Sequence, residues 1–314
     1  MYSPPTLLFN PHLETIYPAL LRKVNLIPYT RERIATPDND FLDLDWLRQG
    51  SIKLIIISHG LEGNTSRAYI RGMAKAFFNS GYDVLTWNYR GCSNEINRNL
   101  RFYHSGATDD LDVVIQHANK INTYTEISLI GFSLGGNLTL KYLGEKGNQL
   151  PLELKKAVTF SVPMDLHSSC IKISSPSNWI YSKRFLHSLK DKIIQKSKVR
   201  SELDSRGIES ITTLMEFDDK FTAPIHGFKN AIDYYTRNSS VHFIKKIEIP
   251  TLIINAKNDP FLGKECFLDT NAIQNTNLRI EYPNFGGHVG FALFNQNGLY
   301  WSELKALDFI QSKV

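Results

Sequence analysis

The chain of 314 residues has only three cysteines, Cys92, Cys170 and Cys266, and they lie far apart in the sequence. Their odd number and wide spacing argue against a disulfide framework and against a metal-binding motif. No uninterrupted apolar run approaches the roughly 20 residues that span a bilayer. Residues 1–10 also lack the basic and long apolar regions of a secretory signal. We therefore expect a cytoplasmic protein that is not an integral membrane protein.

Strong charge of one sign is also missing. The net charge is only +5, and the basic residues do not form a stripe interleaved with aromatic residues, so we expect no binding to nucleic acid. Neither clustered metal ligands nor a dinucleotide-binding fingerprint is present, which predicts an absence of metal and organic cofactors. A hydrophobic fraction of 42% with 21% charged residues is ordinary for a globular protein with one sizeable core.

Short β-branched runs alternate with helical patterns along most of the chain. We expect strands at 31–36, 42–46, 53–58, 82–87, 127–130, 157–162, 250–256 and 278–282. Helices are expected at 66–79, 109–119 and 136–143, with a terminal helix whose apolar face contains Trp301, Leu304, Leu307 and Ile310. This alternation predicts an α/β fold with a doubly wound, mostly parallel sheet of about eight strands and helices on both faces.

One region breaks the alternation. Residues 167–246 are helical and basic in character and have no strand pattern. An insertion at this point is expected to cap the carboxyl edge of the sheet, where open α/β folds bind their ligands. We therefore expect a single domain with an N-terminal segment and hairpin (1–50), a core (51–166 and 247–314) and a helical cap (167–246).

The string Gly131-Phe132-Ser133-Leu134-Gly135 follows an expected strand and opens an expected helix. In the G-x-S-x-G nucleophile elbow the serine sits on a strained turn between a strand and a helix, and small residues must flank it because larger ones would clash. The string alone is weak evidence, but its setting makes Ser133 a candidate nucleophile.

A serine hydroxyl needs a base, and the base needs an acid that orients it. On this architecture the order along the chain is serine, acid, histidine. His288, in a glycine-rich loop beyond the last strand, is the candidate base. Asp259 directly follows a strand and is the favoured acid, and Asp165, which follows the preceding strand, is the alternative. Either aspartate could instead stabilise a turn.

The tetrahedral intermediate of acyl transfer requires hydrogen-bond donors for its oxyanion. The amide of Leu134, directly after the candidate nucleophile, is one expected donor. The amide of Leu61 is the other, because the glycines of His59-Gly60-Leu61-Glu62-Gly63 allow this loop to approach a substrate closely. A plain turn is the alternative for this loop.

At several positions the sequence resembles the YheT-like α/β-hydrolases, candidate esterases related to the abhydrolase-domain lipases and to the medium-chain acyl ester synthases of yeasts. The matching motifs are Asn10-Pro11-His12-Leu13-Glu14-Thr15, His59-Gly60-Leu61-Glu62-Gly63, Asn88-Tyr89-Arg90-Gly91, Tyr103-His104-Ser105-Gly106, Gly131 to Gly136, Glu216-Phe217-Asp218-Asp219, Thr222-Ala223-Pro224, Gly227-Phe228, Asp233-Tyr234-Tyr235 and Gly286-Gly287-His288. The resemblance covers nearly the whole chain. It implies an α/β-hydrolase fold and hydrolysis of short- to medium-chain carboxylic esters, including monoacylglycerols, through Ser133, Asp259 and His288.

Two further histidines receive structural interpretations. His104 and Asp109 fit the H-x4-D string discussed for related acyltransferases, but Thr108, Asp109 and Asp110 are better explained as the capped and charged start of a helix. His12 is expected to cap or pack the N-terminal segment.

The cap combines apolar and basic residues in one helical stretch, 179–198. Such a helix could lie on an anionic lipid surface. We favour the interpretation in which its apolar face covers an acyl pocket and its charged face is solvated.

The sequence thus predicts a serine carboxylesterase or lipase that acts through an acyl-enzyme on a small-molecule acyl ester. Transfer of the acyl group to an alcohol uses the same intermediate and is the alternative activity. A hydrolase-fold protein that binds a ligand without chemistry is the less favoured alternative.

Overall fold

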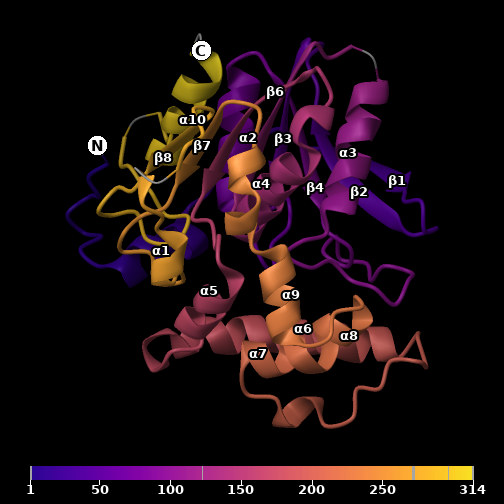
Figure 1. Cartoon of the computed structure of the whole chain (residues 1–314). Helices are drawn as coiled ribbons and strands as arrows, with labels where there is room; N and C mark the ends of the chain where they lie inside the picture. Colours follow the sequence, from indigo (N-terminus) through magenta and orange to yellow (C-terminus); the bar gives the residue numbers. More distant parts are fainter. Residues whose placement is uncertain (1, 122, 271–272, 296, 313–314) are drawn as a thin grey trace.

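The computed structural model describes residues 2–121, 123–270, 273–295 and 297–312 (Figure 1). Within these residues, the sheet contains eight strands. Their spatial order is β1-β2-β4-β3-β5-β6-β7-β8. β1 and β2 pair antiparallel, as do β2 and β4, and the remaining neighbours are parallel. The strands are β1 (Thr30–Ala35), β2 (Phe41–Leu47), β3 (Lys53–Ser58), β4 (Asp83–Asn88), β5 (Glu126–Phe132), β6 (Leu154–Phe160), β7 (Thr251–Ile254) and β8 (Leu278–Glu281). The expected mostly parallel sheet is confirmed.

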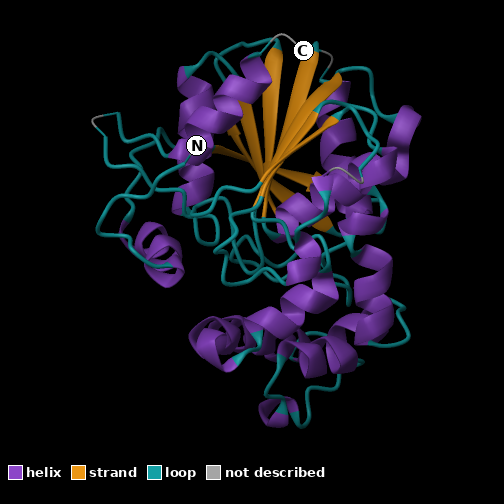
Figure 2. Ribbon diagram, turned by 60° about the vertical axis from the view of Figure 1, so that its left-hand side comes forward, coloured by secondary structure: helices purple, strands orange, loops and turns teal. Residues whose placement is uncertain are grey.

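Helices cover both faces of this sheet (Figure 2). On one face α3 and α4 pack over the central strands, where Leu111, Val114 and Leu138 belong to one buried apolar cluster. On the other face α2 and α10 contribute Phe77 and Ile310 to a second cluster. The helices that flank the sheet are α1 (Pro11–Leu21), α2 (Ala68–Asn79), α3 (Thr108–Lys120), α4 (Leu134–Lys146) and α10 (Trp301–Gln311). The two apolar faces explain why β3 reads as an unbroken β-branched run.

The chain between β6 and β7 is helical throughout its regular elements and groups at one end of the sheet (Figure 1). It has an apolar cluster of its own, which includes Leu186, Ile193, Phe217 and Tyr235. Its helices are α5 (Leu166–Ile173), α6 (Trp179–Ser197), α7 (Leu214–Phe217), α8 (Ala223–Ile225) and α9 (Ala231–Asn238). Among the described residues, no helix combines the length and the apolar character needed to cross a membrane.

Element boundaries differ from the expected ones where a turn intervenes. β6 ends at Phe160 rather than at Val162, because Ser161 adopts a positive φ of 53° and the amide of Val162 donates to the side chain of Asn255. α3 begins at Thr108, but the expected side-chain cap is absent: its N-cap is Ala107, and the Thr108 hydroxyl donates to Glu145 at 2.6 Å.

Candidate active site

Ser133 lies on the turn between β5 and α4 with a φ of 53° and a ψ of −120°. Few residues other than glycine adopt such a positive φ, so the surrounding structure must hold it. A Cβ on Gly131 would lie 2.5 Å from the carbonyl oxygen of Gly135, and a Cβ on Gly135 would lie 2.5 Å from that of Ser58. Both glycines are therefore required sterically, as the nucleophile-elbow pattern predicts.

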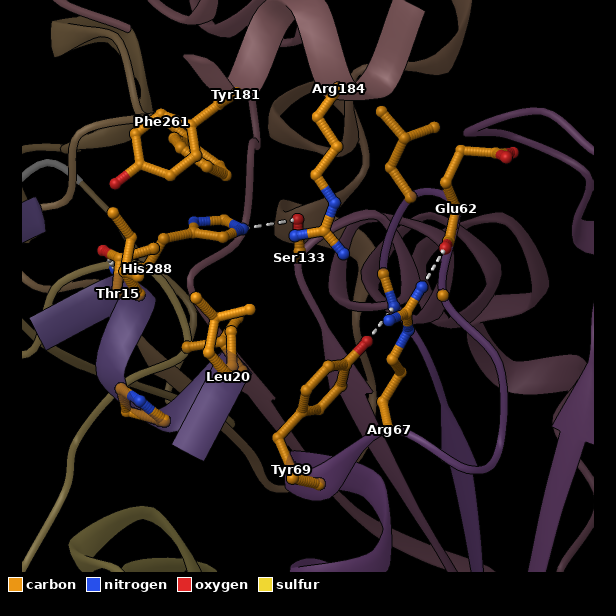
Figure 3. Close-up of a pocket in the computed structure, with 18 of the residues that line it drawn as sticks. Thr15, Leu20, Glu62, Arg67, Tyr69, Ser133, Tyr181, Arg184, Phe261 and His288 are labelled. Atoms are coloured by element: carbon orange, nitrogen blue, oxygen red, sulfur yellow. Dashed lines mark hydrogen bonds between the residues drawn. The ribbon is translucent and has the colours of Figure 1, made fainter. Parts of the chain in front are cut away.

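The three residues predicted for a triad converge in space. His288 Nε2 lies 2.9 Å from the Oγ of Ser133, and Nδ1 lies 2.9 Å and 3.1 Å from the two carboxylate oxygens of Asp259 (Figure 3 shows the serine contact). The Asp259 side chain is fully buried and that of His288 is 10% exposed. Since a carboxylate only accepts hydrogen bonds, Nδ1 carries the proton and Nε2 is free to accept the serine proton.

The alternative acid, Asp165, has a different environment. It is the N-cap of α5, and its Oδ1 accepts from the amide of Ser168 at 2.8 Å. Within the described part of the chain it makes no hydrogen bond to His288. The structure thus brings Asp259, and not Asp165, to the imidazole.

The loop that carries His288 is held by α1, a feature that the pattern of the sequence did not predict. The amide of His288 donates to the Thr15 hydroxyl at 2.9 Å, and the amide of Gly286 donates to the Glu14 carboxylate. Glu14 also accepts from the Asn258 side chain at 2.8 Å, and burial raises the pKa of its carboxyl group. The only advance signal was the motif at residues 10–15.

The two amides predicted to bind an oxyanion belong to Leu61 and Leu134, which line the space around Ser133. In the described residues neither amide has a protein acceptor. The loop of Leu61 is fixed by Tyr69, whose hydroxyl accepts from the amide of Gly60 at 3.0 Å. Both amides are therefore free to donate a hydrogen bond to an oxygen of a substrate.

His59 precedes this loop and is fully buried. Its Nδ1 donates to the carbonyl of Gly60 at 2.8 Å, and its Nε2 accepts from the amide of Tyr89 at 3.3 Å. Burial lowers the pKa of this imidazole to about 3. His59 is therefore neutral at physiological pH and shapes the loop rather than transferring protons.

The remaining candidate histidines pack against other rings. His104 lies 4.7 Å from His226 between ring centroids, and burial holds its pKa well below the usual value. Asp109, its partner in the H-x4-D string, pairs instead with Arg101 at 2.7 Å. His12 lies 3.1 Å from the Tyr181 hydroxyl, so it connects α1 to α6.

Two cavities meet at Ser133. The larger has a volume of about 450 Å³, and its wall includes His288, Tyr69 and Tyr181. The smaller, of about 120 Å³, extends past Leu134 toward the cap. Ser133 lines both cavities, so a bound molecule could extend into both and place one of its own bonds beside the Ser133 hydroxyl.

The comparisons with known proteins agree with the fold. The model of the family described as 'alpha/beta hydrolase fold' matches residues 53–283 of this chain. YheT of Escherichia coli, named as a candidate esterase, is 33% identical over 90% of this chain and 84% of its own length. Phospholipase ABHD3 of Bos taurus is 28% identical over 92% of this chain and 73% of its own.

Among solved structures, the esterase Pf2001 of Pyrococcus furiosus has a TM-score of 0.59 at 18% identity, with 90% of this chain and 92% of that chain covered. At this identity the similarity concerns the fold. Together, the family match, the fold and the extent of the similarity to YheT establish that the chain belongs to the α/β-hydrolase family and, within it, to the YheT-like group.

Proposed function

We propose that the chain is a serine carboxylesterase that cleaves short- to medium-chain acyl esters through an acyl-enzyme. The names of its relatives support a hydrolase of esterase or lipase type. The observation that carries the finer proposal is the chain of contacts from the Ser133 hydroxyl through His288 to Asp259.

In the first half of the reaction, Ser133 Oγ attacks the ester carbonyl carbon while His288 Nε2 takes its proton. Asp259 keeps the imidazole in the required tautomer and stabilises the imidazolium that forms. The amides of Leu61 and Leu134 donate hydrogen bonds to the negatively charged former carbonyl oxygen, and each hydrogen bond lowers the barrier by roughly 3 kcal/mol. The intermediate collapses when the bond to the alcohol oxygen breaks and His288 returns the proton to that oxygen.

In the second half, water takes the place of the alcohol. His288 removes a proton from the water as it attacks the acyl-enzyme, and the second tetrahedral intermediate expels Ser133 Oγ. The serine recovers its proton and the carboxylic acid leaves. An alcohol that enters the larger cavity instead of water would yield a new ester by the same steps.

The test combines labelling with turnover. A fluorophosphonate probe should modify the wild-type chain and leave the Ser133→Ala variant unmodified, and only the wild type should hydrolyse p-nitrophenyl esters of four to ten carbons. A wild type that is neither labelled nor active would contradict the proposal and favour a ligand-binding protein. Product analysis with added glycerol or ethanol separates hydrolysis from acyl transfer, because transfer produces a new ester.

A further inference from the structure

The two cavities at Ser133 can be assigned to the two halves of an ester. The oxygen of the departing alcohol must lie within hydrogen-bond reach of His288 Nε2, because it receives its proton there. His288 lines the larger cavity, and in the described residues it does not line the smaller one. The alcohol half therefore belongs in the larger cavity and the acyl half in the smaller, beside Leu134.

Four charged side chains line the larger cavity: Arg22, Glu62, Arg67 and Arg184. Two of them are neutralised, since Arg22 lies 2.6 Å from the Glu303 carboxylate and Glu62 lies 2.7 Å from the Lys192 ammonium. Within the described parts of the chain, neither Arg67 nor Arg184 pairs with a carboxylate. The larger cavity thus has two uncompensated positive charges.

The two guanidinium groups approach the nucleophile from different elements. Arg184 extends from α6 toward Ser133 (Figure 3). Arg67, at the start of α2, enters the same cavity from the lower side of the view. Arg67 is anchored by one hydrogen bond to the carbonyl of Glu62, at 3.1 Å, which leaves other donors of its planar group unused.

A third observation concerns Tyr69, which lies in the same wall. Burial raises the pKa of its hydroxyl, and the positive charges of Arg67 and Arg184 both act in the opposite direction. The two guanidinium groups therefore act on one small region of the cavity, although they belong to different layers of the fold. Guanidinium groups bind the oxygens of phosphates and carboxylates through paired hydrogen bonds.

We propose that Arg67 and Arg184 form an anion subsite that selects esters whose alcohol half carries a phosphate or a carboxylate. This inference rests on the proposed ester hydrolysis and narrows its substrate class. The negative group lies in the larger cavity between the two guanidinium groups, and the uncharged acyl chain occupies the smaller cavity. A neutral ester would leave both charges without a partner and would bind less well.

The experiment compares esters with one octanoyl chain and different alcohols: 1-octanoylglycerol, 1-octanoylglycerol 3-phosphate and 3-octanoylglycerate. For the wild type we expect kcat/KM for at least one anionic ester to exceed that of octanoylglycerol by about tenfold or more, equivalent to at least 1.4 kcal/mol. The phosphate and carboxylate esters show which anion is preferred. Because Arg184 is exposed, raising the salt concentration should reduce the preference.

Arg184→Gln and Arg67→Gln should each remove most of the preference, measured within each variant as the ratio of kcat/KM for the anionic ester to kcat/KM for octanoylglycerol. Arg67→Lys retains the positive charge and should keep part of the preference. Comparing it with Arg67→Gln separates the effect of the charge from the effect of the hydrogen bond to the Glu62 carbonyl. Lys183→Gln is the matched control, since Lys183 is an exposed neighbour on α6 that does not line either cavity.

Two results would overturn the inference: equal kcat/KM for neutral and anionic esters in the wild type, or an unchanged preference in both glutamine variants. Its failure is distinguishable from failure of the proposed function, because p-nitrophenyl octanoate reports hydrolysis alone. Calorimetric titration of Ser133→Ala with the phosphate ester and with octanoylglycerol tests the subsite without turnover. Tighter binding of the phosphate ester would support the subsite, and equal binding would contradict it.

Discussion

The ammonium of Lys192 lies 2.7 Å from Oε1 of Glu62 and so joins the cap helix α6 to the loop that carries Leu61. The Tyr103 hydroxyl donates to the same oxygen at 2.6 Å. Glu62 has a φ of 52°, a conformation that its contacts must hold. Burial acts to lower the pKa of Lys192, but Cys92 and Glu62 outweigh it and raise the pKa, so the ammonium stays charged. The cap therefore helps to fix one wall of the candidate active site.

Lys192→Met should lower kcat for a neutral ester by about 10- to 100-fold, because the Leu61 amide loses its position relative to Ser133. The measurement is steady-state hydrolysis of p-nitrophenyl octanoate well below the unfolding temperature. Lys190→Met, on the same helix, removes only an exposed hydrogen bond to the carbonyl of Glu209 and serves as the control. Full activity in Lys192→Met would show that the cap does not position this loop.

Asp259→Asn should reduce kcat by about 10⁴-fold, because the imidazole loses the acceptor that sets its tautomer. Asp165→Asn should leave kcat within about threefold of the wild type and cost at most about 1 kcal/mol of stability, since Asp165 caps α5. Activity assays and thermal unfolding of both variants check this pair. The reverse ranking of the two activities would identify Asp165 as the acid.

Arg90→Met should destabilise the fold by about 3–5 kcal/mol, because it leaves buried carboxylates without their cation. Arg90 is 1% exposed and pairs with Asp110 at 2.7 Å, Asp38 at 2.8 Å and Asp40 at 3.1 Å. Urea unfolding gives the free energy of unfolding. Arg206→Met, whose guanidinium is 91% exposed beside Asp204, should leave the unfolding midpoint unchanged. If the urea midpoint of Arg90→Met equals that of the wild type, the prediction is wrong and water takes the place of the lost guanidinium beside the carboxylates.

The burial of Asp218 predicts that the stability of the fold depends on pH. It accepts from Tyr235 and Thr222, each at 2.6 Å, and burial raises its pKa from 3.8 to about 6. The folded state then holds this proton more tightly than the unfolded state, so the contribution to stability is complete below pH 3.8 and is lost as the pH rises through 6.

Asp218→Asn does not titrate, so the melting temperature of the wild type should fall relative to this variant between about pH 4 and 6.5 and then stay level. Thermal unfolding across this range checks the slope. Asp219→Asn, at the exposed neighbouring position, is the control variant and is measured over the same pH range. A constant difference between the wild type and Asp218→Asn would mean that Asp218 is ionised throughout the range.

The strands and the residues Ser133, Asp259 and His288 could be predicted from the sequence because each has a local signal in the residues around it. The period of apolar residues reports strands and helices, and the turn residues report where Ser133, Asp259 and His288 leave the sheet. Contacts between distant segments leave no periodic trace, so the support of His288 by Glu14 and Thr15 and the pairing of Lys192 with Glu62 were not foreseen. The expected cap at Thr108 was wrong, because a side chain on a neighbouring helix competes for its hydroxyl.

The contact between Thr15 and His288 joins residues 273 positions apart. During synthesis the segment with Ser133 is complete well before the loop with His288 is added. The contact that holds the His288 loop against α1 therefore forms only after residue 288 has been synthesised.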